Sequence, residues 1–204
     1  MDTVLKCISR LQEHFENFEL RPAVSVDKVM ALTSFFPGMT EEIIAFYKYC
    51  NGFDCHIQDL GSDGSGRIYS VENIEENIGY MKSYENDNLY TGMFPIKDDG
   101  CGNNDFLWLH EDVAQGSVIF WDHETEDKPE YLLGGSFSKY LSFLCDYLIT
   151  CYHPDGTIKA EYDIDNPDML EYPWPFDSEY LAANDSKSKA IVEHAEYGKV
   201  FNID

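Results

Sequence analysis

Positively charged residues are scarce in this sequence. Its 204 residues include 14 Lys and Arg against 38 Asp and Glu, which gives a formal net charge of −24. A charge of this size repels nucleic acid and anionic lipid, so we expect neither to be a direct partner. It favours encounter with basic proteins instead. The simpler alternative is that the acidity only keeps the protein soluble.

The sequence also lacks long apolar runs. No segment approaches the roughly 20 consecutive apolar residues that are needed to cross a bilayer. Residues 1–18 contain neither an uninterrupted apolar stretch nor a small-residue cleavage site, so we expect no signal peptide. Apolar residues still make up 44% of the chain and aromatic residues 15%, which is enough for a folded core. We therefore expect a folded, cytoplasmic protein.

Cysteine pairs of the C-x-x-C type are absent. Most of the six cysteines lie within or beside apolar helical patterns, which is typical of reduced, buried thiols in a cytoplasmic protein. A structural zinc site is disfavoured, because such sites take their ligands from closely spaced cysteines and histidines. We predict no metal and no cofactor. The cysteines are Cys7, Cys50, Cys55, Cys101, Cys145 and Cys151.

Apolar spacing predicts a helix at the start of the chain. Apolar residues recur there at alternating spacings of four and three residues, which places them on one helical face. These residues are Val4, Ile8, Leu11, Phe15 and Phe18.

Capping residues mark further helices. Thr40 is a good N-cap for a second helix, which we predict to end at Asn51-Gly52 because both residues tolerate a left-handed conformation. A brief helix is predicted to begin near Ser70, and a long one after Ser136. The predicted buried face of the long helix consists of Phe137, Tyr140, Leu141, Leu144, Leu148 and Cys151.

Strand-like segments occupy the middle of the chain. A short strand is predicted at residues 67–70, and residues 94–97 and 106–109 are predicted to form a hairpin around a loop of turn residues. Both faces of the second hairpin strand are apolar, so we expect it to be central and covered on both sides. Residues 117–122 read as another strand.

Helices, strands and a closing helix in this order predict an α+β protein, with an antiparallel or mixed sheet covered by helices. We expect residues 1–152 to form this domain. The pattern loosens after residue 152, where turns and a proline-rich stretch follow. Residues 153–204 are therefore predicted to be a C-terminal extension packed on the core.

Two acidic clusters flank the predicted turns. Asp98, Asp99 and Asp105 surround the hairpin turn, and Asp122 and Glu124 follow the next strand. Paired carboxylates could support acid–base catalysis or bind a hard cation, but neither cluster has the spacing of a calcium loop. We predict instead that these five residues form a binding surface for a basic protein, with the two clusters near each other if their strands pair.

Cys101 lies in a glycine-rich turn, where a nucleophile would be exposed. No histidine in the sequence is recognisably paired with it. A hydrolase that uses Cys101 or the carboxylates is therefore kept only as a remote alternative.

The order and spacing of these segments resemble those of the SUKH superfamily, which includes fungal cell-wall glucan-synthesis regulators and many bacterial immunity proteins. The resemblance covers roughly residues 30–150. It is carried by an aromatic helix ending in Asn-Gly, a strand that leads into a short helix, the central hairpin, and a last strand before the long helix. These segments are residues 43–52, 68–74, 94–109, 118–124 and 136–141.

The resemblance implies an α+β fold and a protein that binds without catalysing a reaction. In bacterial members it implies neutralisation of a cognate toxin, often a basic nuclease, and an acidic chain would suit such a partner. A regulatory scaffold or signalling adaptor related to the glucan-synthesis regulators is the alternative. Gly52 and Gly100 are expected to serve backbone geometry.

Overall fold

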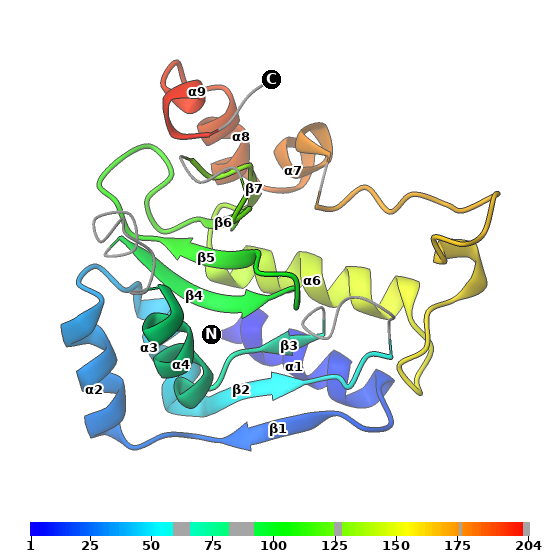
Figure 1. Cartoon of the computed structure of the whole chain (residues 1–204), viewed down its shortest axis with the longest axis horizontal. Coiled ribbons are helices and arrows are strands. Elements are labelled where there is room, and N and C mark those ends of the chain that lie inside the picture. The colour runs from blue at the N-terminus through cyan, green and yellow to red at the C-terminus, as the bar shows by residue number, and fades with distance from the viewer. Residues whose placement is uncertain (59–65, 82–91, 125–127, 176, 202–204) are drawn as a thin grey trace.

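Two antiparallel sheets form the centre of the molecule (Figure 1). The structure is a computed structural model that describes residues 1–58, 66–81, 92–124, 128–175 and 177–201. The strand orders are β1-β2-β3 and β4-β5-β6-β7. The strands are β1 (Glu19–Pro22), β2 (Cys50–Asp54), β3 (Arg67–Ile68), β4 (Met93–Asp98), β5 (Asn104–Trp108), β6 (Val118–Trp121) and β7 (Tyr131–Gly134).

Helices pack on both sheets, and this confirms the predicted α+β class. The helix α1 packs on α6, while α6 packs on α3 and β7, and α4 packs on β4. The helices are α1 (Asp2–His14), α2 (Val26–Phe35), α3 (Glu41–Tyr49), α4 (Val71–Met81), α6 (Phe137–Cys151), η1 (Ala160–Tyr162), α7 (Ser178–Asn184), α8 (Ser186–Val192) and α9 (Tyr197–Val200).

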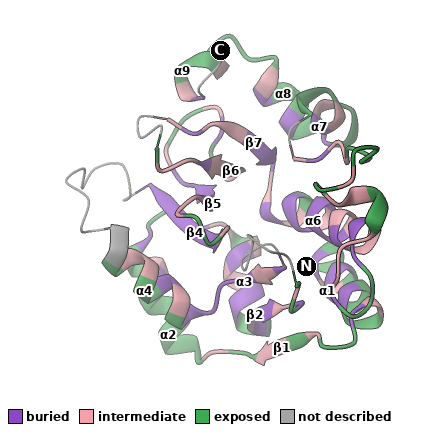
Figure 2. Cartoon of the chain, turned by 45° about the vertical axis from the view of Figure 1, so that its right-hand side comes forward, coloured by how far each residue is buried: buried purple, intermediate pink, exposed green. Residues whose placement is uncertain are grey.

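The central hairpin and the long helix are present as predicted. Strand β5 lies between β4 and β6, and all five of its residues are buried. Ser136 caps α6 by accepting a hydrogen bond from the backbone N–H of Lys139 at 3.3 Å. Every residue of the predicted buried face of α6 is buried. Figure 2 shows this burial concentrated in the strands and in the inner sides of α3 and α6.

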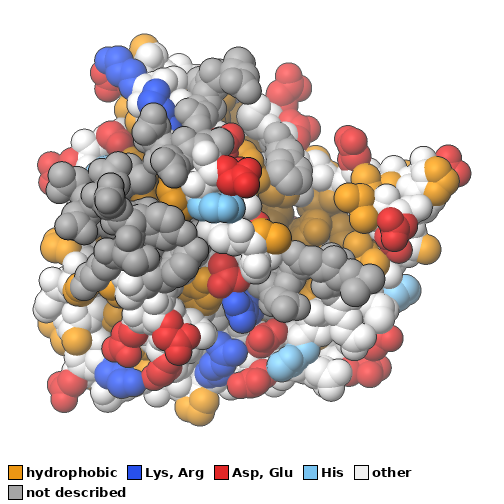
Figure 3. Space-filling view, in the orientation of Figure 1, with side chains coloured by type: hydrophobic (Ala, Val, Ile, Leu, Met, Phe, Trp, Pro, Cys, Tyr) orange, Lys and Arg blue, Asp and Glu red, His pale blue; other side chains and the backbone are white. Residues whose placement is uncertain are grey.

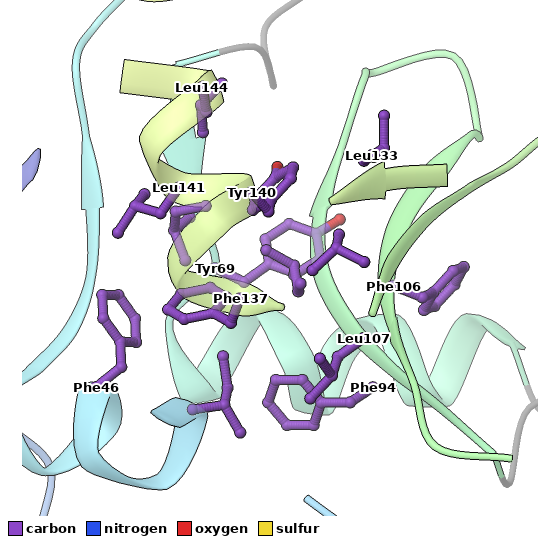
Figure 4. Packing of buried hydrophobic residues seen from close by; sticks show 14 of the residues in the cluster. Phe46, Tyr69, Phe94, Phe106, Leu107, Leu133, Phe137, Tyr140, Leu141 and Leu144 are labelled. Atoms are coloured by element: carbon purple, nitrogen blue, oxygen red, sulfur yellow. The ribbon is translucent and has the colours of Figure 1, made fainter. Parts of the chain in front are cut away.

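Alternation along β5 decides which side chains meet α6. Leu107 faces α6 together with Phe94 of β4, whereas Phe106 lies on the opposite side of the strand (Figure 4). Phe137 and Tyr140 of α6 complete the contact layer. Because side chains alternate along a strand, Asp105 shares the face of Leu107 and points toward α6, where Tyr140 bonds to it.

Between the ends of β3 and β4, a backbone hydrogen bond joins the two sheets. The N–H of Tyr69 donates to the carbonyl oxygen of Ile96 at 2.8 Å. The register of β4 against β5 shifts between Pro95 and Lys97, so Ile96 has no partner residue in β5. The shift is a β-bulge, which bends a strand and increases its twist, and it lies where β4 meets the first sheet.

The prediction that a helix ends at Asn51-Gly52 is wrong. Helix α3 ends at Tyr49, and β2 runs through both residues. Asn51 accepts a hydrogen bond from the N–H of Val71 at 2.8 Å and donates to Glu72 at 2.8 Å, so its side chain ties β2 to the start of α4. Asn51 therefore makes a tertiary contact and does not end a helix.

Gly52 has a geometric role of its own. Its φ is +79°, and a Cβ there would lie 2.4 Å from the carbonyl oxygen of Ile68 and 2.5 Å from that of Tyr69. Only glycine fits this approach of β2 to the end of β3. The expected backbone role of Gly52 is therefore confirmed, and Gly100 also has a positive φ of +78°.

Helix α2 and the strands β1 and β7 were not predicted from the sequence. Strand β1 contains Pro22 and is only partly buried at the sheet edge, and α2 buries only Val29 and Leu32. Strand β7 has four residues. Such short or weakly patterned segments are stabilised by neighbours that are distant in sequence.

Residues after 152 contribute side chains to the same buried cluster as the sheets. Trp174, Leu181, Ile191 and Phe201 belong to it, and the indole N–H of Trp174 donates to the carbonyl oxygen of Leu133 at 2.9 Å. The division of the chain into residues 1–152 and 153–204 stays a prediction.

Asp105 was predicted to belong to an exposed binding surface, but it is only 5% exposed. The hydroxyl of Tyr140 donates to its Oδ2 at 2.6 Å, and Lys97, directly opposite on β4, places its ammonium 3.7 Å away. Burial raises the pKa of Asp105 above its usual range, while the Lys97 charge and the Tyr140 hydrogen bond act in the opposite direction. The strand begins at Asn104, two residues earlier than predicted, and this places Asp105 inside.

We expect Gly52→Ala to lower the free energy of unfolding by about 3 kcal/mol or more, because the added Cβ meets two carbonyl oxygens at a positive φ. Urea denaturation measures the change. Gly79→Ala is the matched control: a Cβ at Gly79 of α4 meets nothing within 4 Å, so this change should stabilise the protein by about 0.5–1 kcal/mol. Equal stability of the two variants would contradict the role given to Gly52.

We expect Lys97→Met to lower the free energy of unfolding at neutral pH by about 3 kcal/mol, because it leaves the Asp105 carboxylate buried without a cation. The folded-state pKa of Asp105 lies above that of the unfolded chain, so protonation favours the folded state and the loss should shrink as the pH falls. Urea titrations at neutral pH and at about pH 5 measure this. Lys6→Met, at an exposed position of α1, should show neither the loss nor the pH dependence.

Candidate protein-binding site

The β4–β5 turn and the end of β6 lie side by side at one end of the second sheet. Asn103 Oδ1 accepts a hydrogen bond from the N–H of His123 at 3.3 Å and lies 2.9 Å from His123 Nδ1. The pairing of Asn104 with Trp121 in the β5–β6 register produces this proximity. We call Asp98, Asp99, Asp122 and Glu124 the sheet-end carboxylates; the structure brings together the two segments that carry them and leaves Asp105 in the interior.

Asp98 is held by residues of the first sheet. The guanidinium Nη2 of Arg67 lies 2.9 Å and 3.1 Å from its two carboxylate oxygens, and the hydroxyl of Tyr69 donates to Oδ2. Burial, together with the negative charge of Asp98, raises the pKa of the Tyr69 hydroxyl. Asp98 therefore links β4 to the end of β3, and Arg67 neutralises much of its charge.

Asp99 and Asp122 shape the two loops. Asp99 Oδ1 accepts from the N–H of Cys101 at 2.8 Å and from that of Asn103 at 3.2 Å, while Oδ2 accepts from the Asn103 amide at 2.8 Å. Asp122 Oδ1 accepts from the N–H of Glu124 at 2.8 Å. Such aspartate-capped turns are locally stable, so the loops present their charges in a fixed arrangement. Glu124 itself is exposed.

A pocket of about 390 Å³ separates this sheet end from α4. On its wall, the amide of Asn77 donates to Asn104 Oδ1 at 3.0 Å. Glu76, which is exposed on α4, adds a carboxylate that the sequence analysis missed. The signal was its place on the polar side of a helix whose buried side holds Val71 and Ile74. The lining residues are Arg67, Tyr69, Asn73, Glu76, Asn77, Asp98, Gly100, Gly102 and Asn104.

Acidic side chains are spread over the face of the molecule drawn in Figure 3, with basic side chains in a few places among them. Among the residues that the structure describes, no three His, Cys, Asp or Glu side chains form a group that could hold a metal ion. In the same part of the chain, no helix has the length and apolar character that crossing a membrane requires. The arrangement offers fixed negative charge beside a polar pocket, which suits recognition of a positively charged surface.

The sequence was compared with known proteins and with models of protein families. No curated protein matches the sequence significantly. The family model described as SMI1 / KNR4 family (SUKH-1) matches residues 40–142, which is more than half of the chain and runs from the N-cap of α3 into α6. The matched segment contains the central hairpin, the junction of the two sheets and all of the sheet-end carboxylates. The chain therefore belongs to the SMI1 / KNR4 family (SUKH-1).

Proposed function

We propose that this protein is an immunity protein that binds and neutralises a basic protein toxin. The observation that carries the proposal is the family match, because proteins of this family are commonly immunity proteins. The net charge of −24 indicates the kind of partner, since it attracts a basic protein at long range and repels nucleic acid. A basic nuclease toxin would meet both conditions.

The sheet-end carboxylates and Glu76 are the proposed contact region. Asp99 and Asp122 hold their loops by hydrogen bonds, so the partner would meet charges that are already in place and would lose little entropy in ordering them. Asp98 contributes less net charge than the others, because Arg67 is paired with it. Neutralisation would follow if this surface covers the basic residues with which a nuclease holds its substrate.

We place the protein in the cytoplasm, where an internal toxin would have to be neutralised. Five of the six cysteines are buried as free thiols, and only Cys101 is exposed. Buried free thiols are typical of reducing compartments. This supports the localisation without depending on the identity of the toxin.

A regulatory scaffold is the alternative within the same family. A scaffold would hold several partners weakly, whereas an immunity protein would hold one partner tightly and at defined stoichiometry. The discriminating experiment is capture of partners by the tagged protein from lysates, with washes of rising ionic strength. One stoichiometric basic protein that survives moderate salt and loses its enzymatic activity in the complex supports immunity. Several salt-labile partners would support the scaffold.

A Cys101-dependent hydrolase is the second candidate, and one observation bears on it. Asn103 orients the ring of His123, and this ring lies against Gly102, the residue that follows Cys101. A nucleophile, a base and an orienting amide therefore come from one turn and its neighbour. Turnover of any substrate that is lost in Cys101→Ala but kept in Cys151→Ala would support this candidate over the binding function.

We expect Glu76→Lys combined with Glu124→Lys to slow association with the captured toxin by about tenfold or more at low salt, because the change reverses charge where the partner approaches. Stopped-flow or surface-binding kinetics measure the rate. The variant leaves unchanged Asp98, Asp99 and Asp122, which hold the sheet junction and the two loops.

The matched control is Asp2→Lys combined with Glu13→Lys on α1, which changes the net charge by the same amount at a different surface. It should slow association only slightly. If both variants slow association equally, the whole-molecule charge and not the sheet end guides the partner.

A further inference from the structure

The loop between η1 and the segment that leads to α7 exposes large apolar side chains. We call residues 160–171 the tip. Ile164 is 86% exposed, Leu170 56% and Met169 39%. In Figure 1 the tip stands out from the body of the molecule, beyond the end of α6. Apolar groups so exposed lower the solubility of a protein unless a partner covers them.

The backbone of the tip is held by its own hydrogen bonds. The N–H of Leu170 donates to the carbonyl oxygen of Glu161 at 2.7 Å, and the Asn166 amide donates to that of Ala160 at 2.7 Å. Asp163 Oδ1 accepts from the N–H of Asp165 at 3.0 Å. Backbone groups and polar side chains make these bonds, so the shape of the tip does not depend on its apolar side chains. A preformed loop loses little entropy when it binds.

Acidic residues surround the apolar ones. The tip contains Glu161, Asp163, Asp165, Asp168 and Glu171, and the sequence contains no Lys or Arg between residues 159 and 187. An apolar centre with a charged rim has the composition of a protein-binding patch. The rim here carries one sign only, and this determines the kind of partner that fits.

We propose that the tip is a docking element that inserts Ile164 and Leu170 into an apolar pocket rimmed by Lys and Arg on a basic protein. Charge complementarity selects this occupant. A second copy of the chain would bring one acidic rim against another, and an anionic membrane or a nucleic acid would be repelled. Of these candidates, a basic protein is the one that would both cover the apolar side chains and neutralise the acidic rim.

The proposal rests on the proposed function in one respect, because it assigns a second contact to the same basic partner. Figure 3 shows a hollow lined with hydrophobic side chains between the tip and the sheets. The ring centroids of Tyr147 of α6 and Tyr172, which follows the tip, are 5.5 Å apart, so aromatic packing anchors the tip on α6. A partner seated on this face would meet fixed charge at the sheet end and apolar anchors at the tip.

The test uses the full chain and a defined probe. The probe is a fluorescein-labelled helical peptide with Leu on one face and Lys on the other, and its companion has Ser in place of Leu at the same charge. We expect Ile164→Ser combined with Leu170→Ser to weaken binding of the Leu/Lys peptide by about tenfold or more, because two apolar anchors are lost. Fluorescence anisotropy measures the affinity. The Ser/Lys peptide should bind the native chain at least about tenfold more weakly than the Leu/Lys peptide.

The matched control is Val26→Ser combined with Met30→Ser, which removes exposed apolar side chains from α2 instead. It should leave the affinity unchanged. Three results would each overturn the proposal. They are an equal loss of peptide affinity in both variants, no loss in the tip variant, and self-association of the native chain that the tip variant abolishes. If Glu76→Lys combined with Glu124→Lys weakens peptide binding but the tip variant does not, the docking role of the tip is overturned and the proposed function stands. If no toxin is captured, the proposed function fails, but the peptide measurement still tests the docking role of the tip.

Discussion

The junction of the two sheets is the constraint on which the rest of the structure depends. Three groups form it: the backbone bond from Tyr69 to Ile96, and the Arg67 and Tyr69 side chains on Asp98. Because the bonds run from β3 to β4, they fix the orientation of the second sheet relative to the first. The pocket beside α4 and the position of the β4–β5 turn both follow from that orientation.

Charge serves two separate purposes in this protein. Asp105 and Lys97 form a pair in the interior, where removing either partner is costly but the pair itself adds little net stability. The sheet-end carboxylates remain in contact with solvent, where their charge acts at long range and is screened by salt. A count of charges in the sequence does not separate these two sets, since their members are neighbours along the chain.

The parts of the fold that local patterns determine could be predicted from the sequence. The buried face of α6 and the central position of β5 follow from apolar spacing alone. The proximity of the β4–β5 turn and the end of β6 followed from pairing those strands. The split into two sheets could not be predicted, because it depends on which distant strands pair, such as β1 with β2, and no local pattern contains that information. Asp105 was misplaced because the strand was predicted to begin at residue 106, which left Asp105 in the turn; as a strand residue it shares the face of Leu107 instead.

The aspartates that hold the β4–β5 turn and the exposed carboxylates Glu76 and Glu124 are different residues. The first group bonds to the backbone and to Arg67, whereas the second projects from finished elements of the fold. Substitutions in the second group therefore leave folding intact while they change the electrostatic pattern of the surface. This separation allows the charge pattern of the surface to change through successive substitutions, without passing through an unstable intermediate.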